Sequence, residues 1–513
     1  MKKTSLFDAF TAAVSGAIAL VSPRKAARFR SERAMYKRLY TAGQLTGANK
    51  RWFPLMRTAD QDIRQAQRVM SARARDIAQN SPYISGAIER IGNNTVRQGI
   101  RPQFRLRKAS GEMDTRKNRQ IEDIFDRWAR YCDVTGHDSY WQLQKLVLRH
   151  MWYDGHIFVH RVFDRSVPPG IPPLRLEVLE CDYLNWAITG IQPNGNLARE
   201  GIEFDKAGRP VAYHVFKQHP GDLIFVERFG ESVRIPASDM IHVYDRRRAS
   251  QTRGISWLAA SIMEAYDLDE YKSYERIGAK LAAAFGIFIK STYPDIASGL
   301  GVPAGDASDS ASIPDYIEPG RIQTLPPGTD ISIASHNRPG TQYEPYVRDT
   351  LRSLSVGAGM SYEAFSNDYT SASYSSSRAA ALEERLTYSG QQFFLNEKFN
   401  NHIVRWFMDA LYISGLGPAM PGYSQDPARY HESVWWQNPG WTWVDPLKDG
   451  RAVELKVGLG ITTRREAAAQ EGEDWDEVID GLIEEEKRMS DLLRLRKQNE
   501  DIMLNAVTLP QGH

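Results

Sequence analysis

The stretch that decides the architecture runs from Ser256 to Phe285 and reads SWLAASIMEAYDLDEYKSYERIGAKLAAAF. Leu258, Ile262 and Tyr266 lie four residues apart, and the apolar series continues through Tyr274, Ile277, Leu281 and Phe285. A spacing of three or four residues keeps apolar side chains on one helix face, and the Ala282–Ala284 run adds helix propensity. The pattern predicts one long helix over residues 256–285.

Downstream of this helix, residues 291–320 are dense in Ser, Gly, Pro, Ala and Asp, with five acids and no base. Such a composition is typical of a loop rather than a packed element. A second helical pattern follows from Tyr343 to Val356 and ends in Gly357-Ala358-Gly359. The sequence therefore predicts two helices that flank a protruding, acidic, loop-rich region.

The next unusual segment is Ser366–Ser377, SNDYTSASYSSS, which has no aliphatic residue larger than Ala and no Lys or Arg. Such a segment cannot bury a core, so we expect it to be mobile. From Arg378 the apolar spacing predicts another long helix, which passes Leu382 and Trp406 and ends near Gly415.

The chain before this region mixes helices and strands. Helices are expected from Asp60 and from Pro82 and twice more after residue 115; strands are expected at 104–107, at His156–Val162 and repeatedly over 170–245. In the tail, Asp445-Pro446 and Thr463-x-x-Glu466 are helix-start signals, and the last helix should end near Leu504. The fold class is α+β, mainly α.

Charge is distributed unevenly along the 513 residues, although the net charge is only +2. Residues 1–57 hold twelve Lys and Arg against two acids, which indicates a basic arm; residues 466–486 hold ten acids and no base. Two cysteines, Cys132 and Cys181, are too few for a disulfide framework, so we expect folding in a reducing cytosol. The apolar stretch at residues 10–21 imitates a secretory signal without a clear cleavage site, and no apolar run is long enough for a membrane span.

Motifs for catalysis are weak. A phosphate-binding loop would need Gly where Ile289 stands in the fragment Gly286–Thr292, so nucleotide binding is disfavoured. Four acids, Glu264, Asp267, Asp269 and Glu270, could form a metal cluster for nuclease chemistry, since Asp267 and Glu270 share a helix face. A solvated or inter-subunit helix face is the simpler interpretation. Isolated histidines at His214 and His242 have no ligand-spaced partner in sequence. We therefore predict no enzyme activity, no catalytic residues, no metal and no cofactor.

Four ordered segments carry a family resemblance. They are Ala72–Ile88 (ARARDIAQNSPYISGAI), Ile241–Tyr244 with Ser250–Gly254 (IHVY, SQTRG), Gly357–Glu363 with Tyr374–Ala379 (GAGMSYE, YSSSRA), and Trp441–Asp445 before the helix that carries Glu454. In this order, over residues 60 to 490, they resemble the lambda-type portal proteins of tailed bacteriophages. Ser250 departs from the family pattern, which has Gly there.

The resemblance implies a portal fold that assembles as a closed ring, normally twelve-fold, at one capsid vertex. Its implied divisions are a basic arm (1–57), a wing (58–255), a stem helix (256–290), a clip (291–340), a second stem helix (341–360), a tunnel loop (361–377), a long helix back to the wing (378–444) and a helical crown (445–513).

The resemblance also implies a function and a set of sites. The ring would be the conduit for DNA packaging and ejection in the virion, assembled in the host cytoplasm. Its implied partners are double-stranded DNA, the terminase large subunit, a head-completion or adaptor protein, and the major capsid and scaffold proteins, with no membrane. The expected DNA-channel residues are Ser366, Asn367, Asp368, Tyr369, Thr370, Ser373, Tyr374 and Ser375; the expected hinges are Gly357 and Gly359; the expected docking residues of the clip are Asp295, Asp306, Asp309, Asp315 and Glu318.

Physical reasoning agrees with a conduit, because DNA that must slide is hindered by Lys and Arg contacts, each of which adds salt-sensitive affinity. Hydroxyl groups contact phosphates more weakly. Two other interpretations stay open: a DNA-packaging motor or nuclease subunit, and a monomeric nucleic-acid-binding module that uses the basic arm.

Overall fold

A computed structural model describes residues 54–222, 231–284, 288–291, 329–332, 340–441 and 445–507, with Val14, Ala17 and residues 22–25. Its internal contacts divide the chain into residues 1–61 and residues 62–513, and each part is considered by itself. Nearly all of the predicted basic arm lies outside the described residues, as do the five predicted clip acids.

Four helices come first, and the boundary between the two parts falls in the first turn of the first of them. They are α3 (Ala59–Asn80), α4 (Pro82–Thr95), α5 (Thr115–Ala129) and α6 (Tyr140–Tyr153). Their starts follow from local chemistry: Pro82 occupies the first turn of α4, Asp114 accepts a hydrogen bond from the Lys117 amide, and Ser139 forms a capping box with Gln142. The predicted helices in this region are confirmed.

Two antiparallel sheets follow. The three-stranded sheet has the order β3 (Leu174–Leu179), β2 (His156–Phe163), β9 (Met240–Tyr244). The five-stranded sheet runs in chain order through β4 (Gly190–Ile191), β5 (Leu197–Arg199), β6 (Ile202–Phe204), β7 (Pro210–Phe216) and β8 (Ser232–Pro236). Short 3-10 turns, η3 (Cys181–Tyr183) and η5 (Ala237–Asp239), join some of these strands.

A close backbone approach joins these sheets to the helices that follow. At Gly155, which has a φ of 78°, an added Cβ would collide with the backbone of Ile255, and at Gly254 it would collide with the carbonyl group of Gly155. Only glycine permits two backbones to approach this closely. The turn Ser250–Gly254 therefore needs its final glycine for packing.

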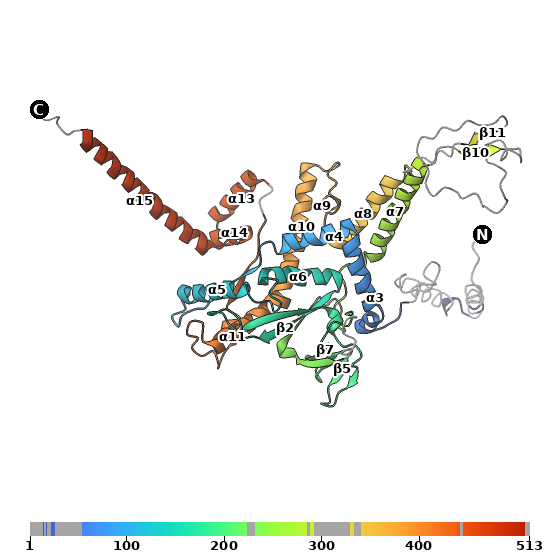
Figure 1. Ribbon diagram of the computed structural model, residues 1–513, viewed down its shortest axis with the longest axis horizontal. Coiled ribbons are helices and arrows are strands. Elements are labelled where there is room, and N and C mark those ends of the chain that lie inside the picture. Colours follow the sequence, from blue (N-terminus) through green and yellow to red (C-terminus); the bar gives the residue numbers. More distant parts are fainter. Residues whose placement is uncertain are drawn as a thin grey trace, which may run out of the picture. The chain divides into compact units, whose positions relative to one another are not determined.

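The predicted pair of long helices is present as a hairpin of α7 (Ile262–Ala284) and α8 (Tyr343–Ala358), drawn in yellow-green and orange-yellow in Figure 1. The Tyr271 and Tyr343 rings stack at 5.9 Å, and Ser353 Oγ donates to Glu264 Oε2 at 2.7 Å, so the helices are antiparallel. Helix α7 begins six residues later than predicted. Ser256 Oγ instead donates to the Trp152 carbonyl group, and residues 257–261 form turns.

Beyond the hairpin the chain leaves and returns through a two-stranded antiparallel ribbon. Strand β10 (Phe288–Ser291) pairs with β11 (Thr329–Ser332), with Phe288 opposite Ser332. The fragment inspected as a phosphate-binding loop therefore includes a strand that follows a helix, which is the opposite of the strand–loop–helix order that phosphate binding requires.

The chain then forms a helical rod with a short helix before it. Helix α9 (Tyr362–Ser366) precedes α10 (Tyr374–Leu395), a π-helical turn η7 (Asn396–Asn400) and α11 (Asn401–Ser414), which ends at Gly415 as predicted. The rod begins at Tyr374, four residues before the expected Arg378, because Ser373 forms a capping box with Ser376. Helix α12 (Ala428–His431) and strand β12 (Val434–Gln437) follow. Strand β12 pairs with β1 (Arg101–Phe104), which lies three residues before the strand predicted at 104–107 and shares only Phe104 with it.

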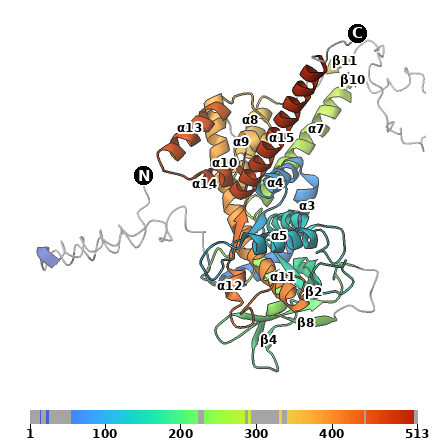
Figure 2. The same cartoon turned by 90° about the vertical axis from the view of Figure 1, so that its left-hand side faces the viewer.

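The tail consists of α13 (Pro446–Gly458), α14 (Arg464–Glu471) and α15 (Trp475–Val507), the dark red helix of Figure 2. Both predicted start signals are confirmed: Asp445 accepts from the Lys448 amide, and Thr463 forms a capping box with Glu466. No helix in the described part of the chain is long and apolar enough to cross a membrane.

The main core lies where α5, α6 and α11 meet. The Phe125 ring contacts those of Tyr140 at 5.5 Å and Phe407 at 4.9 Å, and Trp128 lies beside it with its indole NH donating to the Leu174 carbonyl group. All four of these aromatic rings are fully buried. The core therefore holds α11, the C-terminal end of the rod, while the hydroxyl-rich segment lies at the N-terminal end of α10.

Candidate functional site

The first part of the expected tunnel loop is a helix anchored in the core. Ser361 caps α9 by accepting from the Ala364 amide, and Phe365 is buried with its ring stacked on Tyr83 at 6.4 Å. Residues 361–366 are therefore not loop. Of the predicted channel residues, Ser366 ends α9, and Tyr374 and Ser375 lie in the first turn of α10. Only residues 367–373 connect the two helices.

This seven-residue connection is organised by two polar side chains. Asn367, with a left-handed φ of 58°, accepts a hydrogen bond from Arg90 Nη2 at 2.7 Å. Asp368 accepts from the Tyr362 hydroxyl at 2.9 Å and from the Thr370 hydroxyl at 2.6 Å. The Thr370 bonds, and then Tyr362, hold the pKa of Asp368 below its ordinary value, so its carboxylate stays charged.

The exposed surface of the connection carries hydroxyl groups and one negative charge. Tyr369 and Tyr374 are 56% and 60% exposed, and Thr370, Ser373 and Ser375 are exposed as well. Arg378, at the boundary, forms an ion pair with Asp449 of α13 at 2.6 Å. The segment therefore presents no free cation to a neighbouring phosphate.

The two predicted hinge glycines occupy different positions. Gly357 lies inside α8, where an added Cβ would collide with the Ser261 hydroxyl group, so the structure shows a close contact at this position. Gly359 follows the helix with a left-handed φ of 67°. Of the two, Gly359 is therefore the one whose backbone conformation favours glycine.

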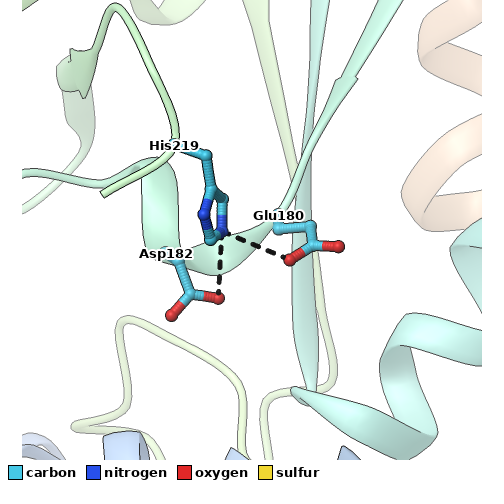
Figure 3. A group of neighbouring side chains, drawn as sticks. All are labelled: Glu180, Asp182 and His219. Carbon is cyan, nitrogen blue, oxygen red and sulfur yellow. Dashed lines mark ion pairs between the residues drawn. The ribbon is translucent and has the colours of Figure 1, made fainter. Parts of the chain in front are cut away.

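The acids weighed as a nuclease site have local partners. Glu264 accepts from Ser353 across the hairpin, and Glu270 accepts from the Tyr274 hydroxyl at 3.2 Å. Among the residues that the structure describes, the group with metal-ligand spacing is a different one, formed by Glu180, Asp182 and His219 (Figure 3).

That group already has a cation beside it. His219 Nε2 lies 3.5 Å from Glu180 and 4.0 Å from Asp182, and Arg75 Nη2 lies 2.5 Å from Asp182 and 3.4 Å from Glu180. Arg75 also forms an ion pair with the buried Asp154 at 2.8 Å. The guanidinium compensates the carboxylates, so the cluster is explained as an ion-pair network that joins α3 to the start of β2.

The isolated histidines have partners that sequence spacing could not show. His242 Nε2 lies 3.0 Å from His156 Nδ1, although 86 residues separate them, and His214 lies 3.5 Å from Glu203. Burial lowers the pKa of His156 to about 3 and that of His242 well below its ordinary value. Both rings of the buried pair are therefore neutral at physiological pH.

A second acidic group joins the tail to α5. Glu122 accepts from the Phe104 amide at 2.7 Å, while Gln103 donates to Asp474 at 2.6 Å and Arg119 forms an ion pair with Asp480 at 3.4 Å. Burial, followed by the charges of Asp474 and Glu477, raises the pKa of Glu122 to about 7. No sequence signal marked Glu122, because Asp474 and Glu477, the acids that raise its pKa most, are more than 350 residues away.

Comparison with known proteins identifies the family of this chain. The family model for phage portal proteins of the lambda family matches residues 46–392, more than half of the chain. The chain belongs to this family. It is 27% identical over 483 residues to the probable portal protein of Halomonas phage phiHAP-1, with 92% of this chain and 90% of that protein covered.

The chain is also similar to a second portal protein and to a chain in a solved structure. Portal protein B of Escherichia phage lambda is 22% identical over 474 residues, with 86% of this chain and 87% of that protein covered. Among solved structures, a chain from the neck of a native GTA particle, computed with C12 symmetry, aligns with a TM-score of 0.46 and 14% identity, covering 81% of this chain and 95% of that chain.

Proposed function

We propose that copies of this chain, twelve by the family pattern, close into a ring at one vertex of the capsid and form the conduit for DNA. A ring of identical subunits needs two different complementary surfaces on each copy. Within the described part of the chain, helix α7 has an exposed apolar face suited to such a contact, formed by Met263, Tyr266, Tyr274 and Ile277.

The observation that carries the proposed conduit is the chemistry of the connection between α9 and α10. A channel that grips each phosphate would resist translocation, because every Lys or Arg contact adds salt-dependent affinity. Residues 361–377 contain no Lys or Arg, and the adjacent Arg378 is paired with Asp449. We place residues 367–375 at the channel surface, where exposed hydroxyls and the charge of Asp368 contact passing DNA weakly.

The partners follow from charge. Residues 291–320 carry five acids and no base, which suits docking of a basic surface on the terminase large subunit or an adaptor protein. The basic residues 1–57 suit contacts with DNA, the scaffold or the inner capsid wall. Of these two segments the structure describes only Ser291 and, in the basic one, Val14, Ala17 and residues 22–25 and 54–57.

The proposed conduit is tested by adding the cation that the native segment lacks. Ser371→Arg with Ala372→Arg should slow DNA translocation in a packaging assay, while Ser371→Gln with Ala372→Gln adds similar bulk without charge and should package normally. These positions are better than Ser373, because Ser373 caps α10 and its loss would cost about 1 kcal/mol of helix stability.

A second set of substitutions removes the native contacts. Replacing Asp368, Tyr369 and Tyr374 by Ala should leave rings and empty heads normal yet reduce the yield of stably filled heads. If the arginine variant and the alanine variant both package and retain DNA like the parent, these residues do not line the channel.

A further inference from the structure

One side of helix α3 presents polar residues to a cavity of about 300 Å³, called here the α3 cavity. These residues are Arg64, Gln67, Arg68 and Ser71, and their spacing of three or four residues puts them on one face of the helix. A face with this spacing is normally apolar where it packs inside a protein. The polar composition of this face therefore indicates a role other than packing.

The other walls of the α3 cavity come from segments far away in the sequence. They belong to the start of β2, the η3 turn and its continuation, the residue after β5 and the turn before Gly254, and the residues concerned are His156, Cys181, Asp182, Leu184, Trp186, Glu200, Pro220 and Arg253. Arg253 belongs to one of the segments that carry the family resemblance, and Ser71 directly precedes another, Ala72–Ile88. The proposed conduit does not involve either residue.

Four buried residues around the cavity are polar. Gln67, Ser71, His156 and Arg253 are each no more than 8% exposed, and the side-chain amide of Gln67 contacts Nε2 of His156. The hydroxyl of Ser71 is buried and has no hydrogen-bond partner among the described residues. Leaving a buried hydroxyl unpaired is costly, so this group points to a partner that the chain itself does not supply.

Both carboxylates in the lining of the cavity already have cationic partners. Glu200 forms ion pairs with Arg64 at 2.7 Å and with Arg253 at 3.1 Å, so one carboxylate serves two guanidinium groups. Asp182 lies 2.5 Å from Arg75, in the ion-pair network that Figure 3 shows in part. The lining thus has three guanidinium groups against two carboxylates, and the third guanidinium belongs to Arg68.

Arg68 has no acidic partner in the described part of the chain. Its side chain is exposed, and its guanidinium lies over the Trp186 ring at 4.7 Å. Such stacking uses the flat face of a guanidinium and leaves the N–H groups at its edge able to donate. Ser71 lies three residues further along α3, so that the two side chains start about 5–6 Å apart and can reach one common acceptor.

We propose that the α3 cavity binds a phosphate group, which accepts hydrogen bonds from Arg68 and Ser71 and lies beside Arg64. A phosphate offers several acceptor oxygens in different directions, which suits a guanidinium and a hydroxyl that approach at different angles. The volume is at the lower end of the range for small-molecule sites, which suits a phosphate ion or a mononucleotide. Every lining residue belongs to one chain, so the inference goes beyond the proposed conduit and does not depend on a ring.

The direct test is calorimetric titration of the full-length protein with inorganic phosphate at low salt. This probe is used because DNA would also contact the proposed channel. Arg68→Gln and Ser71→Ala should each weaken phosphate binding about tenfold, since each removes a hydrogen bond to a charged group. Arg73→Gln is the matched control: Arg73 is exposed on the same helix but does not line the cavity, so this change should leave binding unaltered.

The melting temperature gives a second test, in which the sign of the effect decides. Without phosphate, Ser71→Ala should not lower the melting temperature, because the hydroxyl that it removes has no partner. With phosphate, the parent protein should be stabilised more than the variant, because a ligand stabilises the folded state that binds it. If Ser71→Ala lowers the melting temperature equally with and without phosphate, the hydroxyl has a structural role and the proposal is wrong.

The remaining outcomes identify the ligand or overturn the site. Tighter binding of adenosine monophosphate than of phosphate indicates a nucleotide, and equal affinity indicates free phosphate; both support a phosphate site. The proposal is overturned if phosphate does not bind saturably, if acetate binds as tightly as phosphate, or if Arg73→Gln weakens binding as much as Arg68→Gln. A chain that stays monomeric would contradict the ring and would still bind phosphate, so the two proposals can fail separately.

Discussion

The ion-pair network around Arg75 gives the sharpest prediction for stability. Its guanidinium lies 2.8 Å from Asp154, whose side chain is fully buried, and also contacts Asp182 and Glu180. Burial alone would raise the pKa of Asp154, but hydrogen bonds from His150 and Arg75 outweigh it and lower that pKa. The Arg75→Ala variant leaves a buried carboxylate with the His150 ring, 2.8 Å away, as a remaining hydrogen-bond partner.

The expected loss follows from the burial of the pair. Removing one member of a buried ion pair typically costs about 3–5 kcal/mol, and the 27% exposure of Arg75 together with the retained His150 places this case near 3 kcal/mol. Arg75→Lys keeps one charge but not the planar fork that reaches several acids, so about half of that loss is expected.

The assay is the apparent melting temperature at one protein concentration and one scan rate, since assembly and irreversibility both affect it. The matched control is Lys217→Ala, which removes a half-exposed ion pair with Glu231 at 2.7 Å and should cost less than about 1 kcal/mol. If Arg75→Ala lowers the melting temperature no more than this control does, the network does not hold α3 to the start of β2.

Three further changes test other parts of the structure. Glu122 has a raised pKa of about 7, so between about pH 4.5 and 7 the folded state holds a proton that the unfolded state has lost, and stability should fall as the pH rises. Glu122→Gln should remove this pH dependence of the melting temperature; an unchanged slope would contradict the assignment. Gly357→Ala should add about 1–3 kcal/mol of strain against Ser261 and so lower the melting temperature, and adding Ser261→Gly should relieve this loss. Equal losses with and without the second change would exclude the contact. Asp445→Ala should cost about 1 kcal/mol at the start of α13, measured as the local rate of amide hydrogen exchange, and unchanged exchange would show that the cap is unimportant.

Local chemistry explains which parts of the fold could be predicted from the sequence. The helix starts at Pro82, Asp445 and Thr463 depend on side chains within three residues, and each is confirmed. The starts of α7 and α10 were predicted at the wrong residues, each for its own reason. Ser256 is held by Trp152, about a hundred residues away, while the Ser373 cap was hidden in a serine run that resembles a loop.

The site could be predicted only in part. Its amino-acid composition can be read from one short stretch of sequence, but its contacts join residues that are far apart in the sequence. The absence of Lys and Arg in residues 361–377 is visible in the sequence. The bonds from Arg90 to Asn367 and from Arg378 to Asp449 join residues 277 and 71 positions apart, and no spacing rule reveals them. The same limit applies to the His156–His242 pair and to the acids around Glu122.

The central claim is that this portal-family chain closes into a ring around DNA, and the most direct test is the mass and image of the purified full-length protein. The account predicts a single closed ring, twelve-fold by the family pattern, with an open axial channel lined by residues 367–375. A chain that remains monomeric at all protein and salt concentrations, or a ring whose channel excludes those residues, would contradict it.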